Sequence, residues 1–388
     1  MHTSSRMRPV LAASAACIAL VAPVHAAPFP TGYARAVAAD SARLAATPLT
    51  LDAAIRRALV AHPTLHLLYI ARGIAPDALA DTLTKQPSTL DVVRDVLGPL
   101  PAGDTLIPAV LAAVTDAQTA WYTLAAAQGG HDAAQQLQQA ALASAELAEG
   151  QSDAGNLAEP ELLAAQLAAN HADAELGERL LQLQQARRML ATALDLPVTA
   201  ALETTPMPAL PGKPAWLGDG AALLALAHAG APAFRLARQA ESTAEARLSP
   251  RITSRAITLP LARSNVFTAD DGERERWPTE QVAAHADLRA LEDALIGAQQ
   301  QAAQDWRQAE LAAARQPLLA ARTRATLQRY NGMLAGVDAL LQAKQAQLAG
   351  KQDELQARRD TWIALAHLQA LLGGQLPSSQ PDQTGAQP

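Results

Sequence analysis

Apolar residues recur every three or four positions through four long stretches of the chain, on a background rich in alanine, leucine and glutamine. This spacing is that of one face of an α-helix. It predicts helices over about residues 105–154, 158–194, 279–328 and 335–372. Alanine at the contacting positions lets helices approach closely, so we expect long rods packed side by side.

Proline divides the remaining sequence. A helix that begins near residue 49 should stop before Pro63, which then starts the next one. Another short helix is expected over about 219–247. Residues 197–216 contain five prolines and should form an extended connector. Pro317 should bend or break the third long helix, because it lacks a backbone N–H and its ring clashes with the preceding turn.

The long stretches also form a repeat. Residues 154–166, AGNLAEPELLAAQ, align with residues 331–343, NGMLAGVDALLQA. The alignment equates the turns and the helix starts behind them: Gly155 with Gly332, Leu157 with Leu334, and Glu161 with Asp338. Trp121 and Trp306 also correspond, after an eight-residue difference in hairpin length. At the second turn, Gly332 should take the left-handed conformation that ends one helix before the next begins.

Similarity at a spacing of about 180 residues predicts a duplicated fold. The expected class is mainly α, with two tandem copies of a long antiparallel helical hairpin of the coiled-coil or α-barrel type and at most a small β part. The predicted organisation is a signal peptide at 1–26, a flexible amino-terminal segment at 27–47, a first repeat at 48–196, a proline-rich connector at 197–216, a second repeat at 217–376 and a disordered tail at 377–388.

The first 26 residues have the pattern of a cleaved secretory signal. Arg6 and Arg8 precede a short apolar run that ends in a small-residue site at Ala26. The only cysteine, Cys17, lies inside this segment, so cleavage leaves no disulfide or cysteine–metal site. The alternative is that Cys17 is the lipidated residue of a lipoprotein. Beyond the signal, no run of about 18 apolar residues predicts a transmembrane helix.

Charge and motifs exclude several classes of function. The formal net charge is -6 and no basic patch runs along the chain, so nucleic acid is not an expected partner. The sequence contains no Gly-x-Ser-x-Gly, phosphate-binding glycine loop or zinc-protease motif. His62 and His66 have the spacing of a helical metal pair, but no third ligand is near them in the sequence. We therefore expect no enzyme, no cofactor and no metal site.

Two segments together resemble the TolC-like outer-membrane efflux family, and especially its metal-efflux-like branch. Residues 49–65, LTLDAAIRRALVAHPTL, look like the family's leading helix with its helix-breaking pair, here His62-Pro63. Residues 329–345, RYNGMLAGVDALLQAKQ, and their counterpart at residue 155 look like its duplicated hairpin tips. The resemblance covers about residues 48–376.

The resemblance implies a homotrimer in the outer membrane with most of the chain in the periplasm. It implies a passive channel for substrates, including metal ions, that works with a periplasmic adaptor protein and an inner-membrane pump. Each subunit of the family contributes hairpins to a helical tunnel and a few strands to a shared membrane part.

The sequence departs from the family at these strands. The membrane part of the first repeat should lie between Leu65 and Thr105, but residues 82–104 hold three prolines and offer no pair of alternating segments. Residues 251–267 could supply one strand that turns at 270–272, but the returning arm at 273–282 is too charged to face lipid. The sequence therefore leaves open a reduced family member, and an alternative function: a non-conducting periplasmic helical scaffold that binds partner proteins.

Two sets of candidate site residues follow, each with a simpler explanation. Gly155, Leu157, Gly332 and Leu334 form the hairpin tips; turn geometry explains them, and the resemblance adds docking of the adaptor. Glu161 and Asp338 lie just inside the helices behind the tips. The helix dipole favours a carboxylate there by about 0.3–1 kcal/mol. The resemblance instead places them at the channel entrance, where rings of carboxylates would attract cations.

Overall fold

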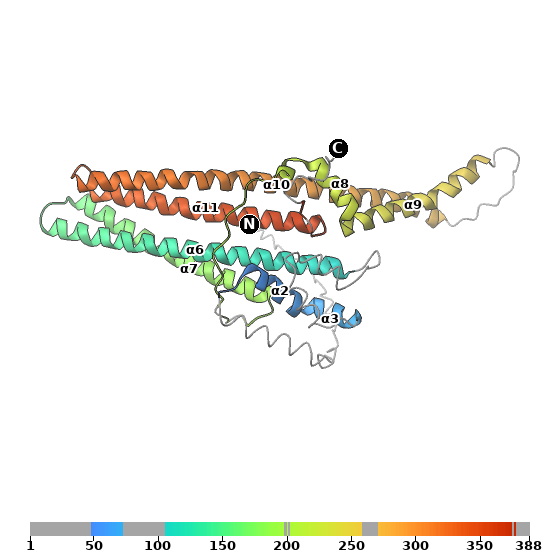
Figure 1. Ribbon diagram of the computed structural model, residues 1–388, viewed down its shortest axis with the longest axis horizontal. Coiled ribbons are helices and arrows are strands. Elements are labelled where there is room, and N and C mark those ends of the chain that lie inside the picture. The colour runs from blue at the N-terminus through green and yellow to red at the C-terminus, as the bar shows by residue number, and fades with distance from the viewer. Residues whose placement is uncertain are drawn as a thin grey trace, which may run out of the picture.

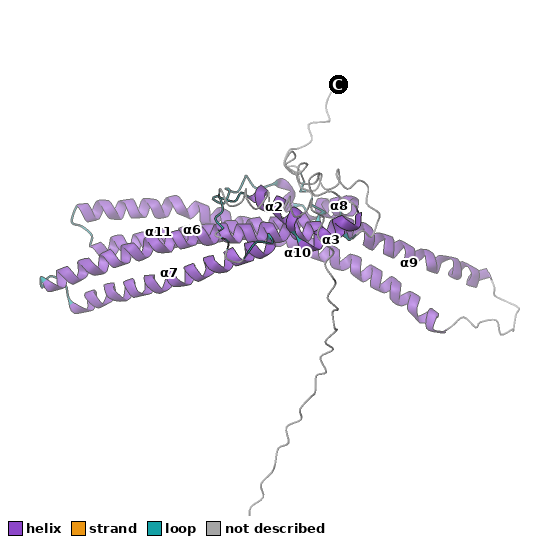
Figure 2. Cartoon of the chain, turned by 90° about the horizontal axis from the view of Figure 1, so that it is seen from below, coloured by secondary structure: helices purple, strands orange, loops and turns teal. Residues whose placement is uncertain are grey.

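The computed structural model describes residues 48–72, 105–197, 200, 202–257, 271–374 and 376–377. The mainly helical fold with two tandem hairpins is confirmed in these residues (Figures 1 and 2). The predicted signal peptide at 1–26, the segment at 27–47 and the tail beyond residue 377 lie outside them.

Four long helices form a row. Their bounds are α6 (Leu106–Asp153), α7 (Glu159–Ala193), α10 (Asp271–Asn331) and α11 (Val337–Leu371). α6 packs against α7, α10 against α11, and α6 against α11. The order across the row is therefore α7, α6, α11, α10, with both hairpin turns at one end (Figure 1). α7 and α10 are the two edges of the row.

Each repeat begins with the same pair of short helices. The first pair is α2 (Leu51–Ala61) and α3 (Pro63–Arg72). The second, after the 3-10 turn η1 (Ala215–Gly218), is α8 (Gly220–Gly230) and α9 (Pro232–Ile257). A capping side chain starts each pair: Thr50 accepts from the Ala53 N–H at 3.2 Å, and Asp219 from the Ala222 N–H at 3.0 Å. The single helix expected over 219–247 is thus divided at a proline, as in the first repeat.

The two hairpin turns are closed by the same backbone pattern. Gly155 has a φ of 72° and Met333 a φ of 60°. At each turn this residue and the next donate N–H bonds of 2.8–2.9 Å to carbonyls three and five residues earlier, as in a Schellman motif. The prediction that Gly332 takes the left-handed conformation is therefore wrong, because Met333 takes it.

The repeats are consequently offset by 178 residues, from Gly155 to Met333, one more than the sequence alignment gives. The same offset relates the residues with positive φ just after α7 and α11, Asp195 at 50° and Gly373 at 71°. Both arms that return from the turns therefore have the same length.

The structural offset gives Trp121 a different counterpart. It brings Gln299, not Trp306, to the level of Trp121. Trp121 donates from Nε1 to the carbonyl of Leu49 at 2.9 Å, and the buried Gln299 donates from Nε2 to the carbonyl of Leu217 at 2.5 Å. Each bond ties a long helix to the segment just before its repeat's first short helix. The predicted correspondence of Trp121 with Trp306 allows for a difference in hairpin length and stays a prediction; Trp306 lies seven residues nearer its turn than Trp121 does.

Pro317 does not break the third long helix, and the described part of the expected strand is helical. α10 runs without a break through Pro317, so packing of the flanking turns against α11 outweighs the proline's cost of about 3 kcal/mol. Residues 251–257 belong to α9, and residues 271–282, including the expected turn and returning arm, belong to α10. Residues 258–270 lie outside the described part. Within it, the β part is a single parallel bridge between Leu49 and Thr204.

Three apolar cores lie where the short helices meet the long ones. The first gathers residues of α2, α6 and α7 around Trp121, the second gathers residues of α8 to α11 around Trp306 and Phe234, and the third joins α2 and α3 to the start of α6. Arg57 is buried in the first, where its Nε donates to the carbonyl of Leu194 at 3.1 Å. Because Leu194 follows the last turn of α7, this cation satisfies the negative end of that helix.

Candidate functional site

The hairpin tips lie together at one end of the molecule. The structure places Gly155 and Leu157 in the α6–α7 turn and Gly332 and Leu334 in the α10–α11 turn. Both turns occur at the same end of the row because α6 and α11 pack side by side (Figure 1). Their role in docking stays a prediction, but their shared position gives a partner one surface to bind.

The two tips are not equivalent. Met333 is 95% exposed and Leu334 is 73% exposed, whereas Leu157 is half-buried. The structural offset accounts for the difference, because it sets Leu334 level with the polar Asn156. Sequence reasoning missed Met333, since the Asn-Gly pair before it directed attention to Gly332. The second tip therefore presents two adjacent apolar side chains, and the first does not.

The acidic positions lie in the first turns of the returning helices. Glu161 is the third residue of α7 and is exposed, and Asp338 is the second residue of α11. Neither helix has a side-chain cap at its amino terminus. Unsatisfied N–H groups therefore favour a carboxylate at both places. The structure sets the two acids one position apart relative to their turns, rather than at identical positions.

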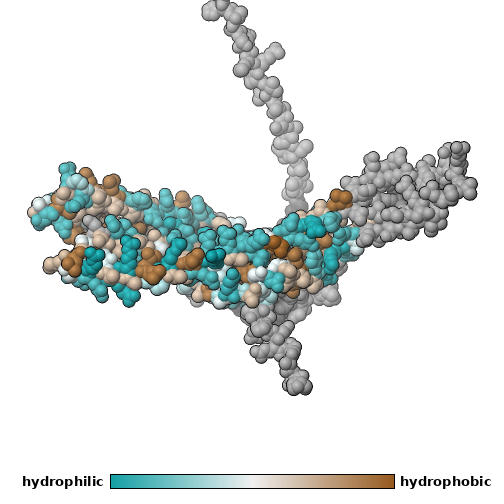
Figure 3. Space-filling view, turned by 90° about the horizontal axis from the view of Figure 1, so that it is seen from above, coloured by the Kyte–Doolittle hydropathy of each residue, from teal (hydrophilic) through white to brown (hydrophobic). Residues whose placement is uncertain are grey.

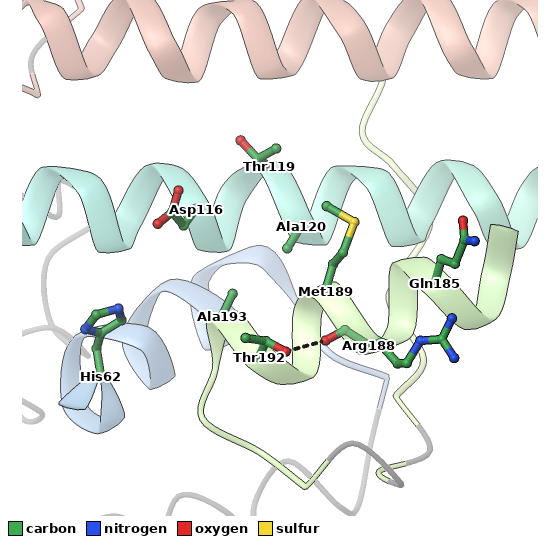
Figure 4. A pocket seen from close by; sticks show the side chains of 9 residues that line it. All are labelled: His62, Asp116, Thr119, Ala120, Gln185, Arg188, Met189, Thr192 and Ala193. Atoms are coloured by element: carbon green, nitrogen blue, oxygen red, sulfur yellow. Dashed lines mark hydrogen bonds between the residues drawn. The ribbon is translucent and has the colours of Figure 1, made fainter. Parts of the chain in front are cut away.

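A cleft with several polar side chains in its lining opens between α2, α6 and α7, with a volume of about 720 Å³. Figure 4 shows His62 and Asp116 toward one end of it, while the side chain of Arg188 extends toward the other. His62 Nδ1 and Thr119 Oγ1 are buried without a hydrogen-bond partner within the described residues. These groups place a few polar atoms in a cleft whose exposed lining is mostly apolar.

The structure does not pair the two histidines that have metal-ligand spacing. The Nε2 of His66 contacts the carbonyl of Val60, which keeps that nitrogen occupied. Across the part of the chain that the structure describes, no three His, Cys, Asp or Glu side chains are grouped so that they could hold a metal ion.

One face of the molecule carries both polar and apolar side chains. Apolar side chains are interspersed with hydrophilic ones over the face shown in Figure 3. Among the described residues, no single helix is long and apolar enough to cross a membrane. The bent pair formed by α8 and the first part of α9, with 73° between its halves, has the length and composition of a membrane span only when its two halves are taken together.

Comparison with known proteins finds similarity in structure. No protein-family model matches the chain, and no curated protein matches it. CusC, whose structures concern folding and transmembrane channel formation, is 15% identical; the match covers 84% of this chain and 95% of that one, with a TM-score of 0.56. The outer membrane protein VceC of Vibrio cholerae is 16% identical over 77% of this chain and 76% of that one, with a TM-score of 0.52.

The CmeC outer membrane channel of Campylobacter jejuni is 12% identical over 77% of this chain and 68% of that one, with a TM-score of 0.52. At identities this low, the similarity concerns the fold alone. Together with the duplicated hairpins, they show that this chain has the TolC-like fold of outer-membrane channels.

Proposed function

We propose that the chain is the outer-membrane channel component of a tripartite efflux system, through which substrates pass from the periplasm to the exterior without chemical change. The observation that carries the proposal is the row of four long helices with both turns at one end. A row with two free edges can close only by pairing with further copies. We propose a homotrimer, in which the row is repeated around a central passage.

A periplasmic adaptor protein docks on the hairpin tips and links the channel to an inner-membrane pump. The shared position of the tips and the exposure of Met333 and Leu334 support this proposal. Replacing Leu157 and Leu334 with aspartate should abolish cross-linking to the adaptor without dissociating the trimer. Adaptor cross-linking that survives both changes would remove the docking role.

The signal at 1–26 supports the proposed location. The chain is exported, the signal is cleaved, and the mature protein lies in the outer membrane with most of its residues in the periplasm. Metal ions are proposed as one substrate class because of the family branch that the second tip resembles. The structural neighbours are channels, which supports a transport role rather than an enzymatic one.

One observation favours the alternative, a non-conducting periplasmic scaffold that binds partner proteins. Residues 251–257 and 271–282 are helical, where a strand and its return were expected to contribute to the membrane part. A chain that keeps the hairpins but extends them with helix in this region could bind an adaptor and conduct nothing.

Fractionation and bilayer recording separate the two proposals. The mature protein should be recovered with the outer membrane and should produce ionic conductance after reconstitution into planar lipid bilayers. A denatured sample of the same preparation provides the baseline. Recovery in the soluble periplasmic fraction, without conductance, would reject the channel and support the scaffold.

A further inference from the structure

We infer that the edge helices α7 and α10 pair between copies of this chain through a charged seam in the half of the row next to the turns. The acidic side of the seam lies on α7 and the arginine side lies on α10. The inference rests on the proposed function in one respect, namely that copies pair edge to edge. It adds which residues make the contact, in what register, and why the contact depends on charge.

The edge formed by α7 is acidic near its turn. Residues 159–178 contain five carboxylates and no lysine or arginine: Glu159, Glu161, Asp173, Glu175 and Glu178. Glu175 pairs with Arg179 at 3.3 Å, and Asp173 accepts a hydrogen bond from Gln138 at 2.9 Å. Glu159, Glu161 and Glu178 are exposed and have no ionic partner among the described residues. This stretch therefore carries uncompensated negative charge.

The edge formed by α10 is basic at the same end. Residues 311–331 contain four arginines and no acidic residue: Arg315, Arg322, Arg324 and Arg329. All four are exposed, and within the described chain none has a carboxylate partner. Arg315, Arg322 and Arg329 recur every seven residues, so they lie along one face of the helix.

Apolar side chains accompany the charges on both edges. On α7, Leu163 and Leu167 are exposed, the latter to 68%; on α10, Leu311 and Leu318 are exposed, the latter to 70%. Helical periodicity sets these leucines on the side away from the buried alanines through which each helix packs against its hairpin partner. Each edge thus has an apolar stripe flanked by charge, which is the pattern of a coiled-coil seam.

The charges also agree in register. Arg329 lies four residues before Met333, and Glu159 lies four residues after Gly155. Arg315 and Asp173 are each eighteen residues from the same turn positions. With the turns of neighbouring copies level, opposite charges therefore meet at these two levels, four and eighteen residues from the turns, whereas Arg322 lies level with Gln166 and Glu178 with Glu310. Each exposed pair contributes up to about 1 kcal/mol, and the two together steer the encounter and fix its register.

The charges on the two edges identify the partner of each edge as a second copy of this chain, in one orientation. α7 cannot reach α10 of its own chain, because α6 and α11 lie between them. Pairing α7 with α7, or α10 with α10, would set like charges against each other. Only α7 against α10 of another copy is complementary. This contact is heterologous, so it repeats from copy to copy until the row closes into a ring.

Engineered disulfides test the seam directly. Leu163 and Ala325 lie eight residues from the turn positions Gly155 and Met333, and both are exposed. In a C17S background, the full chain with Leu163→Cys and Ala325→Cys should form intermolecular disulfides that end in a closed ring. The matched control, Leu163→Cys alone, should give no disulfide-linked dimer, because the seam never brings two α7 helices together.

Charge reversal tests the electrostatic part. R315E/R329E should lower the disulfide yield about tenfold, and adding E159K/D173K should restore it, since the signs of both level pairs are then exchanged across the seam. K351E, on an exposed position of α11, should leave the yield unchanged. Helical circular dichroism checks that each variant folds.

The outcomes separate the seam from the channel. Multimers that form and conduct, but give no disulfide at these positions or show no effect of charge reversal, would overturn the seam and leave the proposed function standing. Disulfide-closed rings that respond to charge reversal but carry no current in bilayers would support the seam and reject conduction.

Discussion

The indole ring of Trp362 stacks on the ring of Tyr122, with centroids 5.6 Å apart and planes 5° from parallel. Trp362 lies on α11 and Tyr122 on α6, so the stack joins the two repeats. The Nε1 of Trp362 also donates to the carbonyl of Pro208 at 3.3 Å. The ring of Trp121 also meets that of Tyr122 edge-on, with centroids 5.2 Å apart. The side chain of Trp362 thus contacts both the other hairpin, through Tyr122, and the connector, through Pro208.

Replacing Trp362 with alanine should therefore destabilise the junction of the repeats. We expect the free energy of unfolding to fall by about 2 kcal/mol, below the range for a fully buried tryptophan because this ring is partly exposed. Trp362→Phe keeps the stack and loses only the bond to Pro208, so it should cost about 1 kcal/mol. Urea unfolding followed by circular dichroism measures both. Equal stability of Trp362→Ala and the parent protein would contradict this role.

Tyr122 should make stability depend on alkaline pH. Burial raises the pKa of its phenol above the ordinary value of 10.0, and the nearby Asp52 carboxylate raises it further. The unfolded chain then releases this proton at lower pH than the folded chain. The stabilisation is fully present below about pH 10 and is lost as pH rises above it.

Urea unfolding between about pH 8 and pH 11 should show this decline. Tyr122→Phe removes the ionisable group and should flatten that part of the curve. Tyr330→Phe is the matched control, because Tyr330 is exposed near the second turn and its loss should leave the pH dependence as it is. A curve unchanged by Tyr122→Phe would assign the alkaline loss to other groups.

Two glycines should respond oppositely to alanine. Gly373 has a φ of 71°, and a Cβ there would lie 2.7 Å from Pro232 Cδ and 3.1 Å from Ala231 Cα. Gly373→Ala should therefore cost about 1–3 kcal/mol. Gly130 lies inside α6, where an added Cβ would meet nothing within 4 Å, so Gly130→Ala should stabilise by about 0.5–1 kcal/mol. Thermal unfolding of both variants measures the difference, and a shift of the same sign for both would contradict it.

Neutralising the acids behind the turns should change ion selectivity and leave folding intact. The double variant Glu161→Gln with Asp338→Asn removes charge from the proposed entrance, so preference for cations over anions should decrease. Reversal potentials in asymmetric salt across a bilayer measure it. Asp353→Asn removes an exposed charge farther along α11 and serves as the control. Unchanged selectivity in the double variant would leave the helix dipole as the whole explanation of these acids.

Local signals in the sequence were sufficient to place most ends of the long helices, although α10 begins at Asp271, before the expected start near residue 279. α6 begins at Leu106 and α7 ends at Ala193, each within about one residue of expectation, because apolar periodicity and helix stops depend on neighbouring residues alone. Local chemistry also separated α2 from α3 at Pro63. It further indicated two copies of one hairpin and placed the candidate tips in their turns.

The correspondence of the copies and the surfaces that remain free depend instead on tertiary packing. The left-handed residue of the second turn is Met333, and Gln299 takes the place of Trp121, because both depend on hydrogen bonds that the sequence alignment does not contain. Continuity of α10 through Pro317 likewise depends on packing against α11, which outweighs local preference. The order of the row, and hence the two free edges, follows from contact between α6 and α11, helices from different repeats whose pairing no local pattern specifies.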